Sequence, residues 1–173
     1  MRKYFKCIPV LLLLLSFVGC GKEITQKDFT DFSEKCRAQE YYQSCNEIVS
    51  GVDTAFYYNL NSDVLFETYT MLEKCRCDAD AFENIKNKTE AEFEMHKIAS
   101  DYAINDVSYD VFIVENENRQ YGEFQEFGFI AFSEENHYID FYWFYNQDYD
   151  MSIYDEASFE EFFEENFSWV KRN

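Results

Sequence analysis

The spacing of apolar residues over the first hundred positions predicts helices. Apolar side chains recur at intervals of three and four residues, as they do in amphipathic helices that face a core on one side. Ser50-Gly51 is a helix stop signal. The expected helical stretches are 26–50, 53–76 with an interruption at 59–63, and 79–101.

After about residue 105 the apolar period shortens toward two, which is typical of β-strands. Three runs rich in β-forming residues, separated by polar turns, predict strands at 109–115, 121–132 and 137–145. The third run is aromatic on both faces, as expected of a strand that is buried on both sides. The short turns favour an antiparallel meander.

The C-terminal segment has the clearest amphipathic pattern. Its phenylalanines recur at helical spacing, and its glutamates occupy the opposite face. We expect Ser158 to cap this helix, and Lys171-Arg172 to complement its dipole at the other end. The predicted fold class is therefore α+β: N-terminal helices, then a three-stranded antiparallel meander, then a C-terminal amphipathic helix.

The N-terminus changes this picture, because its first twenty residues predict export. Basic residues precede an apolar run at 8–18, which is too short to cross about 30 Å of hydrocarbon, so it is a secretory signal. The segment Ser-Phe-Val-Gly-Cys at 16–20 resembles the lipobox of bacterial lipoproteins. That resemblance implies removal of residues 1–19 and attachment of lipid to Cys20. Gly21 in place of Asp after the cysteine implies, by resemblance to Gram-negative lipoproteins, an outer-membrane location facing the periplasm.

On this interpretation, residues 20–27 form a lipidated tether and residues 28–173 a single domain of ordinary size. Removal of residues 1–19, which carry three basic and no acidic side chains, changes the formal net charge from −19 to −22. Phosphate backbones would be repelled, so nucleic acid is excluded as a partner. A surface of this charge favours a basic protein as the partner.

Four cysteines remain after the signal and the lipid anchor are set aside. In an exported domain they predict two disulfides. Cys75 and Cys77 are too close in sequence to favour a bond with each other, so we expect this pair to be linked to Cys36 and Cys45. A zinc site is the alternative, although zinc cysteines usually come as C-x2-C pairs.

Catalytic signals are missing from the sequence. His96 and His137 fall in different predicted elements, with no nucleophile motif beside either, and no phosphate-binding glycine loop is present. Oxygen-bearing side chains at 146, 148, 150 and 152 resemble the start of a calcium loop, but Met151 stands at the turn-glycine position, and a solvated acidic loop is the better interpretation. We therefore predict no catalytic residues, no metal site and no cofactor.

Aromatic side chains are the remaining candidates for function, because aromatic residues dominate the energetics of interfaces. The candidate binding-surface residues are Tyr138, Tyr142, Trp143, Tyr145 and Tyr149. The alternative is that they form an aromatic core.

Together these features predict a membrane-tethered envelope lipoprotein that binds a protein partner and is not an enzyme. An immunity- or inhibitor-type protein directed at a basic partner is one form of this function. A carbohydrate-binding accessory lipoprotein is the alternative, followed by a hydrolase that uses a pair of carboxylates.

Overall fold

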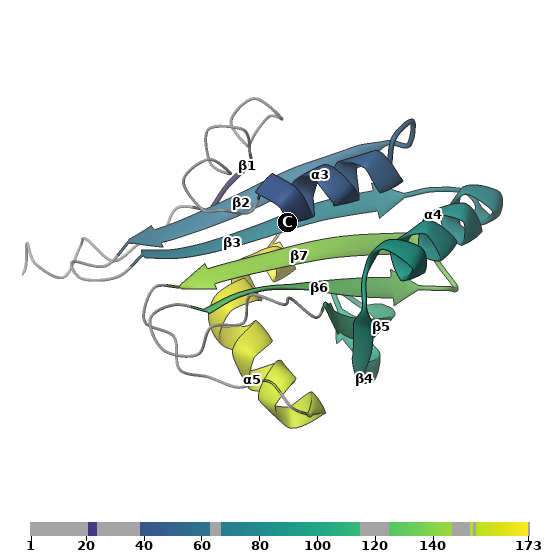
Figure 1. Cartoon of the computed structure of the whole chain (residues 1–173). Helices are drawn as coiled ribbons and strands as arrows, with labels where there is room; N and C mark the ends of the chain where they lie inside the picture. The colour runs from purple at the N-terminus through teal and green to yellow at the C-terminus, as the bar shows by residue number, and fades with distance from the viewer. Residues whose placement is uncertain are drawn as a thin grey trace, which may run out of the picture.

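The chain folds around one antiparallel β-sheet (Figure 1). The computed structural model describes residues 21–23, 39–62, 67–114, 125–146, 153 and 155–172. Six long strands and the three-residue strand β1 lie in the order β1-β2-β3-β7-β6-β5-β4. Their bounds are β1 Gly21–Glu23, β2 Thr54–Ser62, β3 Glu67–Arg76, β4 Met95–Ile104, β5 Val107–Val114, β6 Gln125–Ser133 and β7 Tyr138–Asn146.

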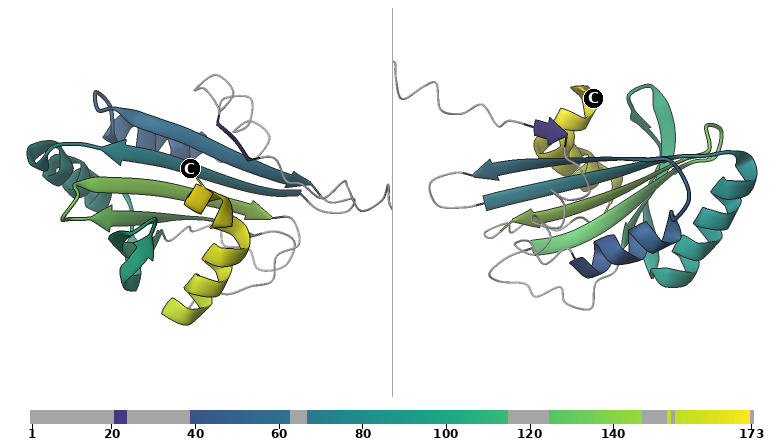
Figure 2. Two further views of the ribbon diagram at one scale, coloured as in Figure 1. Left: turned by 180° about the vertical axis from the view of Figure 1, so that it is seen from behind. Right: turned by 90° about the horizontal axis from the view of Figure 1, so that it is seen from above.

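Helices cover both faces of this sheet, so that the strands form the middle layer of three (Figure 2). One face, called here the α3 face, carries α3 (Gln39–Ile48) and α4 (Ala79–Glu92). The opposite face, called the α5 face, carries α5 (Glu156–Phe167) and the short 3-10 helix η1 (Ser168–Arg172). Among the described helices, none is long and apolar enough to cross a membrane.

The expected N-terminal helices followed by a three-stranded meander are wrong as a description of this fold. The stretch 53–76 forms the hairpin of β2 and β3, in which Thr54 pairs with Cys75. The stretch 79–101 begins as α4, but its last part belongs to β4, the edge strand. Only α3 lies within the first expected helix, and the remainder of that stretch falls outside the described residues.

Burial on both faces explains why β3, the inner strand of the β2–β3 hairpin, resembles a helix in sequence. Along β3, Met71 and Cys75 face α3, whereas Leu72 faces α5, and all three are buried. A strand covered on both sides lacks the alternation of apolar and polar residues that identifies a half-exposed strand. The sequence pattern of β3 is therefore compatible with either element.

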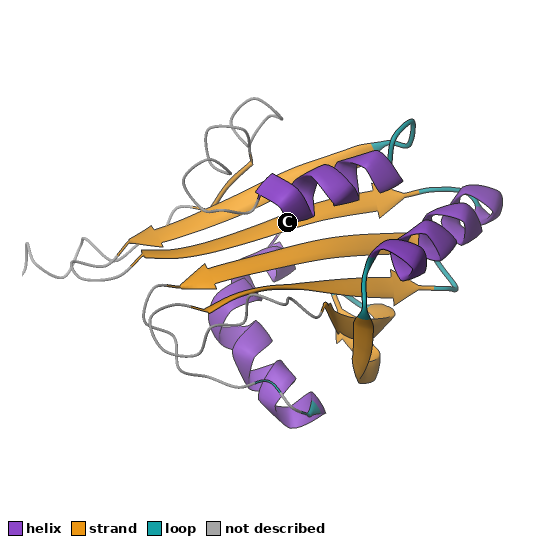
Figure 3. Cartoon of the chain, viewed as in Figure 1, coloured by secondary structure: helices purple, strands orange, loops and turns teal. Residues whose placement is uncertain are grey.

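The C-terminal half matches its sequence pattern more closely. The three expected strands are present as β5, β6 and β7, although they are the inner part of a larger sheet (Figure 3). The expected final helix is present as α5. Its N-cap is Asp155, whose carboxylate accepts a hydrogen bond from the Ser158 backbone N–H, so Ser158 is the third residue of a capping box and not the cap itself.

Candidate functional site

The five aromatic candidates do not form one surface in the described part of the chain. Tyr142 is 0% exposed on the α5 face, where its ring stacks on Phe129 with centroids 4.4 Å apart. Trp143 is 1% exposed on the α3 face, and Tyr145 stacks on it. Tyr138 is half-buried, and Tyr149 lies outside the described residues. The position of β7 between β3 and β6, under helices on both sides, makes Tyr142 and Trp143 core residues.

The three described cysteines are not bonded to one another in the structure. The side chains of Cys75 and Cys77 are hydrogen-bonded to each other, and the Cys77 thiol also donates to the backbone carbonyl of His137. The thiol of Cys45 instead contacts the hydroxyl of Tyr41. Cys20 and Cys36 lie outside the described residues, so lipidation and the disulfide pairing stay predictions. Within the described ranges, no three potential metal ligands gather at one place.

A buried ion pair occupies the α5 face between β3 and β7. Asp140 is 1% exposed, and both of its carboxylate oxygens accept hydrogen bonds from the guanidinium of Arg76. The guanidinium also lies over the ring of Tyr138, with its Cζ 4.0 Å from the ring centroid. Burial raises the pKa of Asp140, whereas Arg76 and the hydroxyl of Tyr109 lower it. Arg76 satisfies both carboxylate oxygens of Asp140, which is the arrangement of a structural ion pair.

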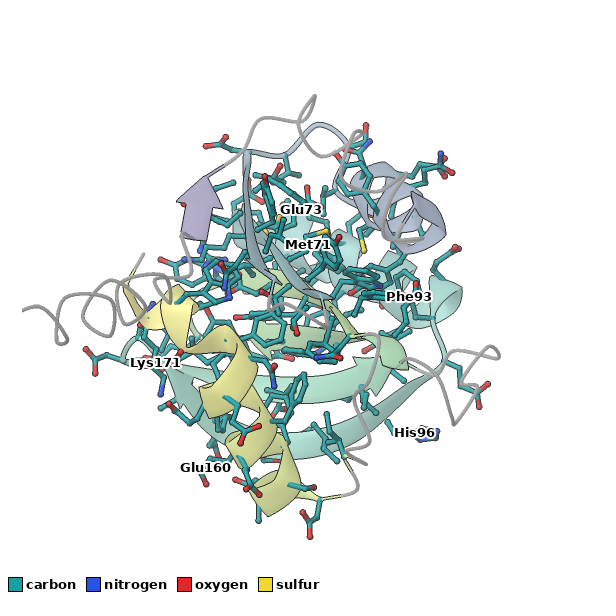
Figure 4. The ribbon with its side chains drawn as sticks, turned by 90° about the vertical axis from the view of Figure 1, so that its left-hand side faces the viewer. Met71, Glu73, Phe93, His96, Glu160 and Lys171 are labelled. Carbon is teal, nitrogen blue, oxygen red and sulfur yellow. The ribbon has the colours of Figure 1, made fainter. Side chains whose placement is uncertain are left out.

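The second buried carboxyl, Glu73, lies on the opposite face, under α3. Its side chain is 2% exposed, and its Oε2 atom has no hydrogen-bond partner among the described residues. Figure 4 shows Glu73 beside Met71 on β3. Burial raises the pKa of Glu73 to about 7, although a hydrogen bond with Thr54 lowers it. The sequence does carry a signal for both buried acids, because each is a charged residue inside an apolar strand.

The two histidines lie in different parts of the fold. His96 is exposed on the edge strand β4, not on the apolar side of a helix as its sequence context indicates. His137 is half-buried in the turn before β7, where its backbone φ is 53°. The Cys77 thiol donates a hydrogen bond to the backbone carbonyl of His137, so this contact does not involve the imidazole ring.

The outward face of α5 is the best candidate for a binding surface. Its inward face is filled by Phe159, Phe162, Phe163 and Phe167, all of which are buried. The exposed acidic residues of the helix, called here the α5 acidic face, are Glu156, Glu160, Glu161, Glu164 and Glu165. Lys171 of η1 forms an ion pair with Glu164, and Figure 4 shows Lys171 and Glu160 in this part of the molecule.

The charge of this face is felt by its neighbour on the sheet. Burial raises the pKa of Tyr102 to about 12, and the charges of Glu164 and Glu160 add to the increase. Tyr102 contacts Phe159 and Phe163, with ring centroids 5.2 and 5.6 Å away. Aromatic packing thus holds α5 against the sheet with its acidic face turned outward.

No protein family, curated protein or solved structure matches this chain. Function must therefore be argued from the surface and its charges.

Proposed function

We propose that the protein is a lipid-anchored envelope protein that binds a basic protein partner through the α5 acidic face. The observation that carries this proposal is the division of α5 into a fully buried phenylalanine face and an outward face of five exposed glutamates. An array of one sign of charge accelerates and orients the association of an oppositely charged partner. Cys20, as a lipidated anchor, would hold the domain at the membrane.

Catalysis by a carboxylate pair receives no support from the buried acids. A hydrolytic dyad needs two neighbouring carboxyls that both reach a substrate. Glu73 and Asp140 are 2% and 1% exposed, and they point to opposite faces of the sheet. Binding is therefore favoured over hydrolysis among the described residues.

Carbohydrate binding is also not supported by the positions of the aromatic rings. Sugar recognition would use rings exposed on one side, with carboxylates at their edges. Tyr142 and Trp143 are buried on opposite faces and cannot stack on a shared ligand. An inhibitor or immunity protein for a basic target remains consistent with the α5 acidic face.

A photo-crosslinking amino acid at Ala157 of α5, expressed in the native envelope, tests the proposal. Ala157 is exposed beside the glutamates, and Asn87, exposed on α4, gives a matched control position on the other face. We expect an adduct with a basic protein from position 157 and not from position 87. The triple variant Glu160→Gln, Glu161→Gln, Glu165→Gln should abolish this adduct, whereas Glu83→Gln, Glu90→Gln, Glu135→Gln, which removes the same charge elsewhere, should not.

Equal adducts from both positions, or an adduct that survives the α5 triple variant, would contradict binding at this face. The anchor is tested separately by the intact mass of the protein extracted from its native membrane. We expect the mass of a chain that begins at Cys20 and carries lipid. An unmodified N-terminus would rule the anchor out.

A further inference from the structure

Glu73 lies at the contact between α3 and the sheet. It occupies the middle of β3 on the α3 face, with Phe56 of β2 and Phe141 of β7 as its register neighbours. On that face α3 packs through Tyr41, Cys45 and Ile48. The helix and the sheet therefore enclose a carboxyl group between apolar surfaces, and its Oε2 atom has no hydrogen-bond partner among the described residues.

The described groups around this carboxyl supply no compensating positive charge. From α3 the nearest titratable groups are the hydroxyl of Tyr41 and the thiol of Cys45, and both have pKa values raised by burial and by the Glu73 charge. On β2, Thr54 forms a hydrogen bond with the Glu73 carboxyl. On β3, burial raises the pKa of the Cys75 thiol, and Glu73 lies close enough for its charge to add to the increase. Glu92, at the end of α4, adds a further negative charge near Cys45.

Ionisation of Glu73 is therefore costly only while α3 covers it. A carboxylate that gains one hydrogen bond but no positive charge in a dry site is not compensated for the hydration it loses. When the helix is docked, the neutral carboxyl avoids this desolvation cost. When the helix is released, water hydrates the carboxylate, so ionisation no longer carries that cost.

The contact between α3 and strand β6 is also closely packed. The ring of Tyr41 lies against Gly128 of β6 so closely that a Cβ at this glycine would be 2.6 Å from the ring. Its hydroxyl is 3.5 Å from the backbone carbonyl of Phe129. Because the ring is wedged against the strand, α3 has little room to shift sideways and admit water to Glu73 while it stays docked.

We propose that α3, with Cys45 as a free thiol, is a proton-controlled helix: protonation of Glu73 favours its docking on the sheet, and loss of the proton favours its release. Release would uncover the buried cluster of Tyr69, Met71 and Trp143, against which Tyr41 and Tyr42 of α3 pack. The chain would thus expose an aromatic surface at higher pH that it conceals at lower pH.

Amide hydrogen exchange of the full chain, followed by mass spectrometry at pH 5 and pH 8, tests this proposal. The pKa of Glu73 is raised from its ordinary value of 4.5 to about 7 under the helix, and we expect the ordinary value once the helix is released; docking is therefore favoured below pH 4.5 and weakens as pH rises through 7. Linkage between these values predicts that α3 protection, corrected for intrinsic exchange rates, falls roughly 70-fold between pH 5 and pH 8. Amides of β7 should stay more protected than those of α3 at both pH values.

Two variants separate the switch from general destabilisation. Glu73→Gln keeps the size of the side chain but does not titrate, so α3 protection should become nearly independent of pH. Glu47→Gln, at an exposed position on the same helix, should behave like the parent protein. The proposal is overturned if α3 protection is unchanged between the two pH values, if Glu73→Gln retains the pH dependence, or if α3 and β7 exchange in a single cooperative opening.

Discussion

Single charged residues inside the sheet decide much of its local stability. Arg76 and Asp140 illustrate this, because one partner is almost fully buried and the other is only partly so, with side-chain exposures of 2% for Asp140 and 34% for Arg76. A buried pair adds little net stability, but removal of one partner leaves an uncompensated charge in a poorly solvated place. The consequence is a strong asymmetry between single and double substitutions.

We predict that Arg76→Met lowers the free energy of unfolding by about 2–3 kcal/mol at pH 7. This is less than the 3–5 kcal/mol of a fully buried pair, because solvent reaches part of the guanidinium. Urea unfolding measures it. The double variant Arg76→Met, Asp140→Leu should recover most of the loss, and Lys97→Met, which breaks the exposed pair with Asp110, should cost less than about 1 kcal/mol. A loss at position 76 no larger than at position 97 would show that Asp140 does not need its partner.

At the scale of elements, the approach of α3 to β6 depends on a glycine. Gly128 has no side chain where the Tyr41 ring lies, and an added Cβ would be 2.6 Å from that ring. We predict that Gly128→Ala destabilises the fold by about 1–3 kcal/mol, the usual cost of overpacking. Differential scanning calorimetry of the parent protein, of Gly128→Ala alone, of Tyr41→Ala alone and of the double variant forms a double-mutant cycle. Additive losses in that cycle would contradict a direct clash.

Elements differ in how well their sequences identify them. The C-terminal helix α5 is evident from the alternation of Phe162 and Phe163 with Glu160 and Glu161, since one of its faces meets solvent. Strand β3 is not evident, because Leu72 and Met71 are buried on opposite faces and no polar face marks the strand. Strand β7 is buried on both faces as well, but its run of aromatic residues identifies it as a strand, whereas the exposed edge strand β4 lies at the end of a helical pattern and is missed.

The residues of the candidate site also differ in how well the sequence places them. The glutamates of the α5 acidic face can be placed from the sequence, because their helix is amphipathic. The burial of Tyr142 and Trp143 cannot, since it depends on which strands flank β7, and β3 lies 60 or more residues away in sequence. Charged residues within apolar runs, such as Glu73, are the signal in the sequence that points to buried polar groups.

At the scale of the whole molecule, excess negative charge opposes the compact state. The sequence has 34 acidic and 15 basic side chains, so repulsion among carboxylates outweighs attraction between ion pairs. The described surface pairs, such as Lys86 with Glu134 and Lys171 with Glu164, are exposed and contribute little each. Salt screens both the repulsion among carboxylates and the attraction within ion pairs. The larger of the two decides whether added salt raises or lowers the free energy of unfolding.

We predict that the free energy of unfolding in urea, an uncharged denaturant, rises by on the order of 1 kcal/mol between 20 and 300 mM NaCl at pH 8. The Glu160→Gln, Glu161→Gln, Glu165→Gln variant should show a smaller rise, because three adjacent like charges are gone before salt is added. Its unfolding free energy at 20 mM NaCl should exceed that of the parent protein. A fall in stability with salt would mean that ion pairs outweigh repulsion, and the α5 acidic face would then lack the uncompensated field on which recruitment of a basic partner depends.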